Sequence, residues 1–172
     1  MNDSAMSPQE LLTLLPQLGI TVSTYTHKAV FTVEESEEIN SQIPGAHTKN
    51  LFVKDKKGNF FLLIAENHAL ISLNKIHPLI GAKSRVSFGK AEDLMKLLGV
   101  TPGSVNAFAP INDKNGNVAV IIDKPLLLHA LINCHPLTNE MTSTISKEDL
   151  LRFLEHIGHI PQIVELSGPK QA

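Results

Sequence analysis

The sequence has little of what disulfide, zinc and membrane proteins depend on. It contains one cysteine, Cys134, and no tryptophan among its 172 residues. A single thiol excludes a disulfide within the chain and a cysteine-rich zinc site. No apolar run reaches the length of a bilayer span, and the first ten residues lack the basic start and apolar stretch of a secretory signal. We therefore expect a cytoplasmic globular protein without membrane contact.

Common ligand motifs are also missing. The eight histidines form no HExxH pair, and neither a GxGxxG nor a P-loop pattern occurs. We therefore expect no metal and no nucleotide cofactor. Cys134-His135 invites interpretation as a nucleophile dyad, but neighbouring side chains in a strand point to opposite faces. Cys134 is better interpreted as a small core residue.

The charge is small overall but unevenly distributed. The formal net charge is −2, yet residues 49–96 hold nine of the fifteen Lys and Arg residues and four of the seventeen Asp and Glu residues. A basic segment on an acidic body suits a partner with localised negative charge, such as one end of an RNA. An uneven solvated surface is the alternative that charge alone leaves open.

Helix and strand signals alternate irregularly along the chain. Ser7-Pro8-Gln9-Glu10 forms a capping box with proline at the first helical position, and Gly19 ends that helix. Further helices are predicted to begin near Thr32, to cover 74–80 and 90–98, and to run from Ser146 to Gly158. Strands are predicted at 20–26, 48–54, 59–65, 105–111, 117–122, 129–134, 140–145 and 161–166. This order excludes a doubly wound sheet and predicts an α+β fold, with a mixed, largely antiparallel sheet or open barrel and surrounding helices. We expect one domain over residues 1–172, with its core at about 7–166.

Two local patterns stand out as candidate chemistry. Lys49-Asn50 opens an otherwise apolar strand, so the Lys49 amine either reaches the surface or lines a pocket and binds an anion. The turn Gly99-Val100-Thr101-Pro102-Gly103-Ser104 exposes backbone N–H groups that can hold an oxyanion, although such turns are commonly plain connections.

Several motifs together resemble those of a known family. They are His47-Thr48-Lys49-Asn50-Leu51-Phe52 with Lys54-Asp55, then Ser87-Phe88-Gly89, then Gly99 to Val105, and finally His135-Pro136-Leu137 with Asn139. In this order they resemble the YbaK/ProX aminoacyl-tRNA deacylases, which are similar to the editing insertion domain of bacterial prolyl-tRNA synthetases. The resemblance runs from about Ser7 to Leu166 and is greatest to the free-standing Ala-tRNA(Pro) deacylases.

The resemblance implies a function and a set of site residues. The function is hydrolysis of the ester that joins alanine to the terminal adenosine of proline tRNA. The implied catalytic residues are Lys49, His135 and the backbone of Gly103 and Ser104. Asn50 and Arg85 are the implied tRNA-binding residues. Cys134 departs from the family pattern, where a bulkier apolar residue is expected, and we expect it to reshape the pocket floor. Mischarged tRNA is the implied partner, with transient contact to prolyl-tRNA synthetase.

The chemistry needs little beyond this set. An aminoacyl ester is already activated, so positioning water and stabilising the oxyanion can suffice, and the ribose 2′-hydroxyl can assist. Two kinds of alternative remain open. One is a deacylase for a Cys-, Ser- or Thr-charged tRNA. The other is a non-catalytic nucleic-acid-binding or regulatory protein, or a small-molecule binding module.

Overall fold

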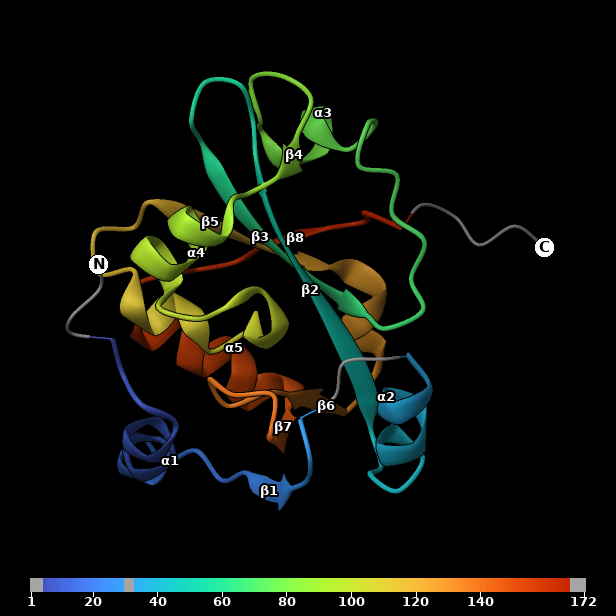
Figure 1. The fold of residues 1–172 in the computed structure, drawn as a ribbon, viewed down its shortest axis with the longest axis vertical. Coiled ribbons are helices and arrows are strands. Elements are labelled where there is room, and N and C mark those ends of the chain that lie inside the picture. The colour runs from blue at the N-terminus through green and yellow to red at the C-terminus, as the bar shows by residue number, and fades with distance from the viewer. Residues whose placement is uncertain (1–4, 30–32, 168–172) are drawn as a thin grey trace.

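The computed structural model describes residues 5–29 and 33–167. An eight-stranded sheet has the order β1-β7-β6-β2-β3-β5-β8, with β4 also pairing with β2 (Figure 1). The strands are β1 Ser23–Thr26, β2 Ala46–Lys54, β3 Phe60–Glu66, β4 Ser87–Phe88, β5 Val118–Asp123, β6 Leu131–Cys134, β7 Met141–Ser146 and β8 Gln162–Val164. The helices are α1 Pro8–Gln17, α2 Val33–Asn40, α3 His77–Ile80, α4 Ala91–Leu98 and α5 Lys147–His156, with 3-10 turns η1 Pro102–Ser104, η2 Ala109–Asn112 and η3 Lys124–Leu128.

The sheet mixes both strand directions, as the sequence predicts. The pairs β1–β7, β6–β7, β2–β3 and β2–β4 are antiparallel, whereas β2–β6, β3–β5 and β5–β8 are parallel. Helices pack around this open sheet, so the predicted α+β class is confirmed. Within the described ranges, no helix is long and apolar enough to cross a bilayer.

Two apolar clusters lie on opposite sides of the central strands. The larger cluster joins β2 and β3 residues such as Phe52, Leu62 and Ile64 to α1, α4 and α5, which Figure 1 shows to the left of β2. The smaller cluster contains Val53 and Leu63 with residues of α3 and the segment before β4. Alternate residues of β2 therefore face different neighbours, because side chains of a strand alternate between its faces.

Local capping fixes two of the helices. The Ser7 hydroxyl accepts from the Glu10 N–H and the Glu10 carboxylate accepts from the Ser7 N–H, which completes the predicted capping box of α1. Ser146 caps α5 by accepting from the Asp149 N–H. Both predicted helix starts are confirmed, whereas the expected cap at Thr32 lies outside the described residues.

The predicted strand at 105–111 is wrong. Asn106 makes a tight local turn instead: its Oδ1 accepts from the Phe108 N–H at 2.8 Å and its Nδ2 donates to the Ser104 carbonyl at 2.7 Å. The η2 turn follows, and Pro110 within it has no N–H to give to a strand ladder. The apolar side chains Ala107, Phe108 and Ala109 are buried in the larger cluster, so their hydrophobicity reflects core packing.

Candidate active site

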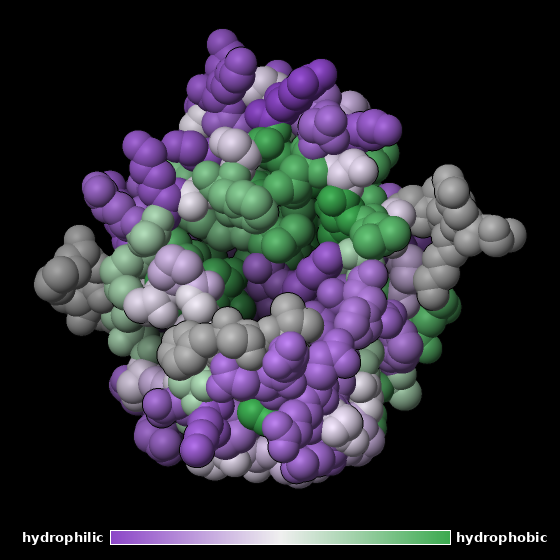
Figure 2. All heavy atoms as spheres, turned by 45° about the vertical axis from the view of Figure 1, so that its right-hand side comes forward, coloured by the Kyte–Doolittle hydropathy of each residue, from purple (hydrophilic) through white to green (hydrophobic). Residues whose placement is uncertain are grey.

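The sheet opens next to β2. Ala46 and His47 pair with β6, and Val53 and Lys54 pair with β4 on the same edge of β2. Between these two contacts, residues 48–52 have no strand partner on that edge within the described part of the chain. A space-filling view shows a hollow on one face of the molecule, with apolar surface above it and both hydrophilic and apolar atoms along its walls (Figure 2).

Lys49 lies at the opening and is half-buried. Its Nζ donates a hydrogen bond to the carbonyl oxygen of Ala69, in the loop after β3. Lys49 shares a face of β2 with Leu51 and Val53, because these residues alternate with Asn50 and Phe52. The amine is therefore held near the sheet by a backbone acceptor.

His135 directly follows β6, the strand that pairs with the start of β2. Its Nδ1 is 2.8 Å from the Met141 carbonyl, which can only accept, so Nδ1 carries the proton and Nε2 keeps a free lone pair. Burial lowers the pKa of His135 below its ordinary value, and the charges of His27 and His47 lower it further, against the raising effect of the Met141 carbonyl. His135 is therefore a neutral hydrogen-bond acceptor near pH 7.

Side chains not singled out by the sequence extend this polar face. The His27 ring lies 6.3 Å from that of His135 and contacts Thr142 Oγ1 at 2.8 Å. Thr144 Oγ1 donates to Asn133 Oδ1 at 2.5 Å. One sequence signal could have revealed this face. Polar residues occur two apart, at 133 and 135 in and just after β6 and at 142 and 144 in β7.

The turn with Gly103 and Ser104 lies beside the loop that follows His135. A Cβ placed on Gly103 would lie 3.5 Å from Asn139 Nδ2, so the two loops approach closely. The Ser104 N–H donates to the Thr101 carbonyl at 2.9 Å and is already used within η1. The Gly103 N–H and the Ser104 hydroxyl are the groups of this turn that can form hydrogen bonds to a ligand.

Asn50 and Arg85 are placed apart from Lys49 and His135. Asn50 points to the other face of β2, where its Oδ1 is buried without a donor among the described residues. Arg85 is exposed in the segment before β4, towards the far end of β2 from His47. The β2–β6 register places Lys49 and His135 each two residues beyond the paired His47 and Asn133. Gly103 approaches the loop after His135, whereas Arg85 lies by the other end of β2.

Cys134 belongs to the larger core. Its side chain is 2% exposed, and burial raises the pKa of the thiol to about 12. The thiol is therefore protonated and unsuited to nucleophilic attack. This placement confirms that Cys134 is a core residue. We expected it to reshape the floor of a pocket, but its thiol points into the core instead.

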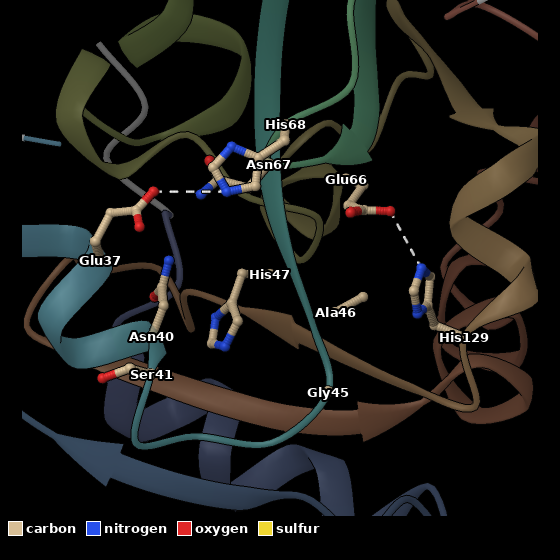
Figure 3. A pocket seen from close by; sticks show the side chains of 10 residues that line it. All are labelled: Glu37, Asn40, Ser41, Gly45, Ala46, His47, Glu66, Asn67, His68 and His129. Atoms are coloured by element: carbon tan, nitrogen blue, oxygen red, sulfur yellow. Dashed lines mark hydrogen bonds and ion pairs between the residues drawn. The ribbon is translucent and has the colours of Figure 1, made fainter. Parts of the chain in front are cut away.

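A cavity of about 340 Å³ lies at the start of β2, where Ala46 and His47 line it (Figure 3). Two pairs border it: His68 Nε2 and Glu37 Oε1 are 3.5 Å apart, and His129 Nε2 and Glu66 Oε2 are 3.1 Å apart. His47 lies between the pairs and bonds the Ile43 carbonyl through Nε2 at 2.8 Å. Among the described residues the lining contains no Lys or Arg, so the cavity suits an uncharged polar group such as a nucleoside better than a phosphate.

Comparison with known proteins agrees with this geometry. The model of the family described as aminoacyl-tRNA editing domain matches residues 27–153. The chain is 36% identical over 158 residues to the Danio rerio prolyl-tRNA synthetase associated domain-containing protein 1, covering 91% of this chain and 85% of the relative. It is 32% identical over 159 residues to the prolyl-tRNA editing protein ProX of Acetoanaerobium sticklandii, covering 92% and 96%.

The fold comparison points the same way. A solved structure that its description provisionally assigns to a trans-editing enzyme for prolyl tRNA synthetase superposes with a TM-score of 0.69 at 18% identity, covering 93% of this chain and 98% of that one. At this identity the likeness supports the fold alone. The family match spans most of the chain and includes Lys49, Gly103 and His135. The chain belongs to the aminoacyl-tRNA editing domain family and is an aminoacyl-tRNA deacylase.

Proposed function

We propose that the substrate is mischarged proline tRNA, and specifically Ala-tRNA(Pro). The observation that carries the proposal is the β2–β6 register, which puts the half-buried Lys49 and the neutral His135 each two residues beyond the paired His47 and Asn133. Two relatives named for prolyl-tRNA editing or association with prolyl-tRNA synthetase support the choice of tRNA. Transient contact with that synthetase, and action in the cytoplasm, belong to the same proposal.

Each site residue has a distinct proposed role. The Lys49 amine leaves the Ala69 carbonyl to hold the RNA end electrostatically. The Gly103 N–H stabilises the oxyanion, because the Ser104 N–H is engaged within its turn. His135 Nε2 accepts a hydrogen bond from the attacking water or from the ribose 2′-hydroxyl.

The terminal nucleoside and its neighbours also need positions. The cavity bordered by the two histidine–glutamate pairs is lined by His47, two residues before Lys49, and has room for the adenosine. Asn50 would act indirectly, because its buried Oδ1 lies on the opposite face of β2 from Lys49. Arg85 would contact a phosphate farther along the RNA.

Selectivity in this proposal follows from size. A synthetase site that fits proline cannot strongly reject the smaller alanine, because each missing methylene changes binding by only about 1–3 kcal/mol. A second pocket that admits alanine and excludes proline then corrects the error. Discrimination therefore takes place in the aminoacyl pocket near Gly103 and His135.

The direct test is hydrolysis of a panel of charged tRNAs. We expect fast deacylation of Ala-tRNA(Pro), and spontaneous rates only for Pro-tRNA(Pro) and Ala-tRNA(Ala). Faster hydrolysis of Cys-, Ser- or Thr-charged tRNA would replace the proposed amino acid while keeping the reaction. Equal hydrolysis of Ala-tRNA(Ala) would reject the preference for proline tRNA.

A lysine variant tests the proposed centre. Lys49→Ala should reduce kcat/KM on Ala-tRNA(Pro) by about 100-fold or more, because it removes the charge that holds the RNA end at the ester. Lys147→Ala is a matched control, since Lys147 Nζ also donates to a backbone carbonyl, that of Leu127, at 2.9 Å. Circular dichroism establishes that both variants fold. Near-normal turnover by the Lys49 variant would remove Lys49 from the mechanism.

A further inference from the structure

Large apolar side chains lie exposed on the Lys49 side of the sheet. Leu70, Leu79 and Phe88 are 84%, 50% and 61% exposed. They belong to the loop after β3, to α3 and to β4, and residues of the first two segments pack against the smaller core cluster. Figure 2 shows apolar surface directly above the hollow. We call these three residues the apolar platform.

The strand register places Phe88 of the platform on the same face of the sheet as Lys49. Phe88 pairs with Val53 in the antiparallel β2–β4 contact, so both side chains lie on the same face. Lys49 is on that face too, four residues earlier in an unbroken stretch of β2. Four residues of extended strand span about 13 Å, a distance that a few unpaired nucleotides can bridge.

The fold itself gives little reason for Phe88. Of the phenylalanines that the structure describes, it alone is exposed, whereas Phe52, Phe61, Phe108 and Phe153 are buried. The two-residue strand β4 is held instead by Gly89, whose N–H donates to the Phe52 carbonyl and whose missing Cβ leaves room for the Phe52 ring. Truncating the Phe88 ring would therefore remove little core packing.

The surroundings of Phe88 are cationic. Residues 82–91 contain Lys83, Arg85 and Lys90 and no acidic residue. Lys54 lies opposite Ser87 in the register. Within the described ranges none of these four cations is in an ion pair. An exposed aromatic ring among unpaired cations is typical of surfaces that bind single-stranded nucleic acid by base stacking.

We propose that the apolar platform binds the unpaired nucleotides that precede the aminoacylated one, with Phe88 as the stacking residue. This inference rests on the proposed function for its substrate. Stacking on Phe88 would draw the RNA tail along β2 towards Lys49 and bring the ester to the hollow. Phe88 is thus a positioning residue that touches the RNA without touching the reacting ester.

The test compares two substrates and four proteins. The proteins are the wild type, Phe88→Ala, Phe88→Trp, and Ile160→Ala as a control for an exposed apolar side chain, since Ile160 is 76% exposed in the segment before β8. The substrates are Ala-tRNA(Pro) and alanyl-adenosine, which lacks the preceding nucleotides. Fluorescence anisotropy with a short unpaired RNA oligonucleotide, at fixed moderate salt, measures binding directly.

The expected pattern is selective. Phe88→Ala should weaken oligonucleotide binding about fivefold or more and raise KM on the tRNA, while kcat/KM on alanyl-adenosine stays unchanged. Phe88→Trp should retain binding, because its ring still stacks, and Ile160→Ala should behave as the wild type. Unchanged binding by Phe88→Ala would overturn the proposal, as would an equal loss on both substrates, which indicates a structural role.

Other outcomes separate the alternatives. Self-association that Phe88→Ala abolishes in analytical ultracentrifugation, with RNA binding intact, would make the platform a protein interface and reject the RNA assignment. If the wild type hydrolyses neither substrate, the proposed function fails. The oligonucleotide measurement still tests the platform in that case.

Discussion

His135 owes its chemical form to burial and to three neighbours. The Met141 carbonyl fixes the proton on Nδ1, and His27 and His47 disfavour a second positive charge nearby. The ring therefore presents Nε2 as an acceptor without needing a carboxylate partner. This suits an ester substrate, whose hydrolysis requires orientation of a water molecule more than a strong base.

The same environment predicts a stability change with pH. The folded-state pKa of His135 lies below the unfolded value near 6.5. As the pH falls through 6.5, the unfolded chain takes up a proton that the folded chain resists, so the free energy of unfolding decreases. Urea unfolding of His135→Gln at pH 7.5 and 5.5 should therefore show a smaller decrease than the wild type.

His156→Gln provides the comparison for that measurement. His156 is exposed at the end of α5, so its removal should leave most of the wild-type pH dependence. Identical pH dependence in the wild type and in His135→Gln would contradict the burial argument.

At the scale of residues, the sequence motifs predicted a set of site residues but not their surroundings. Residue types and order were enough to single out Lys49 and His135. Their places on adjacent segments depend on the parallel pairing of β2 with β6, which joins residues 86 positions apart at His47 and Asn133. No local pattern encodes that pairing, so the roles of Asn133 and His27 could not be inferred from the sequence.

Two turns with the same sequence pattern organise one end of the sheet. Asp55-Lys56-Lys57-Gly58-Asn59 precedes β3, and Asp113-Lys114-Asn115-Gly116-Asn117 precedes β5. In each, the aspartate Oδ1 accepts from the N–H four residues later, at 2.9 and 3.0 Å, and the glycine adopts a positive φ. Since β3 and β5 are parallel and Phe60 pairs with Val118, the two turns lie at the same end.

Asp55 also joins the first turn to the segment before β4. Its carboxylate accepts from the N–H groups of Lys57, Asn59 and Lys83 and from Asn59 Nδ2, each at 2.9 Å. Burial alone would raise its pKa, but the hydrogen bonds from Asn59, Lys83 and Lys57 outweigh it and lower the pKa to about 2. This stabilisation is present above pH 3.8 and is lost as the pH falls towards 2.

Asp55→Ala should therefore destabilise the fold substantially. It leaves several donors without a charged acceptor, and we expect the free energy of unfolding at pH 7 to fall by about 3 kcal/mol. Denaturant unfolding measures this loss. Glu92→Ala, which removes an exposed acidic residue from the first turn of α4, should cost only about 0.5 kcal/mol. Equal effects of the two substitutions would refute the bridging role of Asp55.

Elements with strong local signals were predictable, and those shaped by the core were not. The capping box of α1, the Ser146 cap of α5 and the turn at 55–59 are each determined by a few neighbouring residues. Residues 105–111 are apolar enough for a strand, yet Asn106 and Pro110 turn the chain into the core. The predicted helix at 74–80 shortens to α3 for a related reason: Pro78 lies in its first turn and Gly81 ends it with a positive φ.

Over the whole molecule, the proposed contacts follow β2 from one end to the other. The lysine-bearing turns and Arg85 lie at one end, Phe88 of the platform comes next, and Lys49 and the cavity follow. The two turn aspartates are buried in hydrogen bonds, so they leave the neighbouring lysines without acidic partners on the surface. A chain with a net charge of −2 thereby concentrates positive charge at the end where an RNA duplex would arrive.

This arrangement predicts how salt should affect tRNA binding. Each phosphate neutralised by a basic side chain adds about 0.9 to the slope of log K against log salt concentration. Arg85→Ala should therefore weaken binding to proline tRNA and reduce the slope by about 1, with kcat nearly unchanged because Arg85 is remote from Lys49. Lys124→Ala is the control: Lys124 is exposed in η3, which follows β5 at the opposite end of the sheet from the two turns. A slope that stays the same for Arg85→Ala, or that falls equally for Lys124→Ala, would mean that the RNA does not approach along β2 from its basic end.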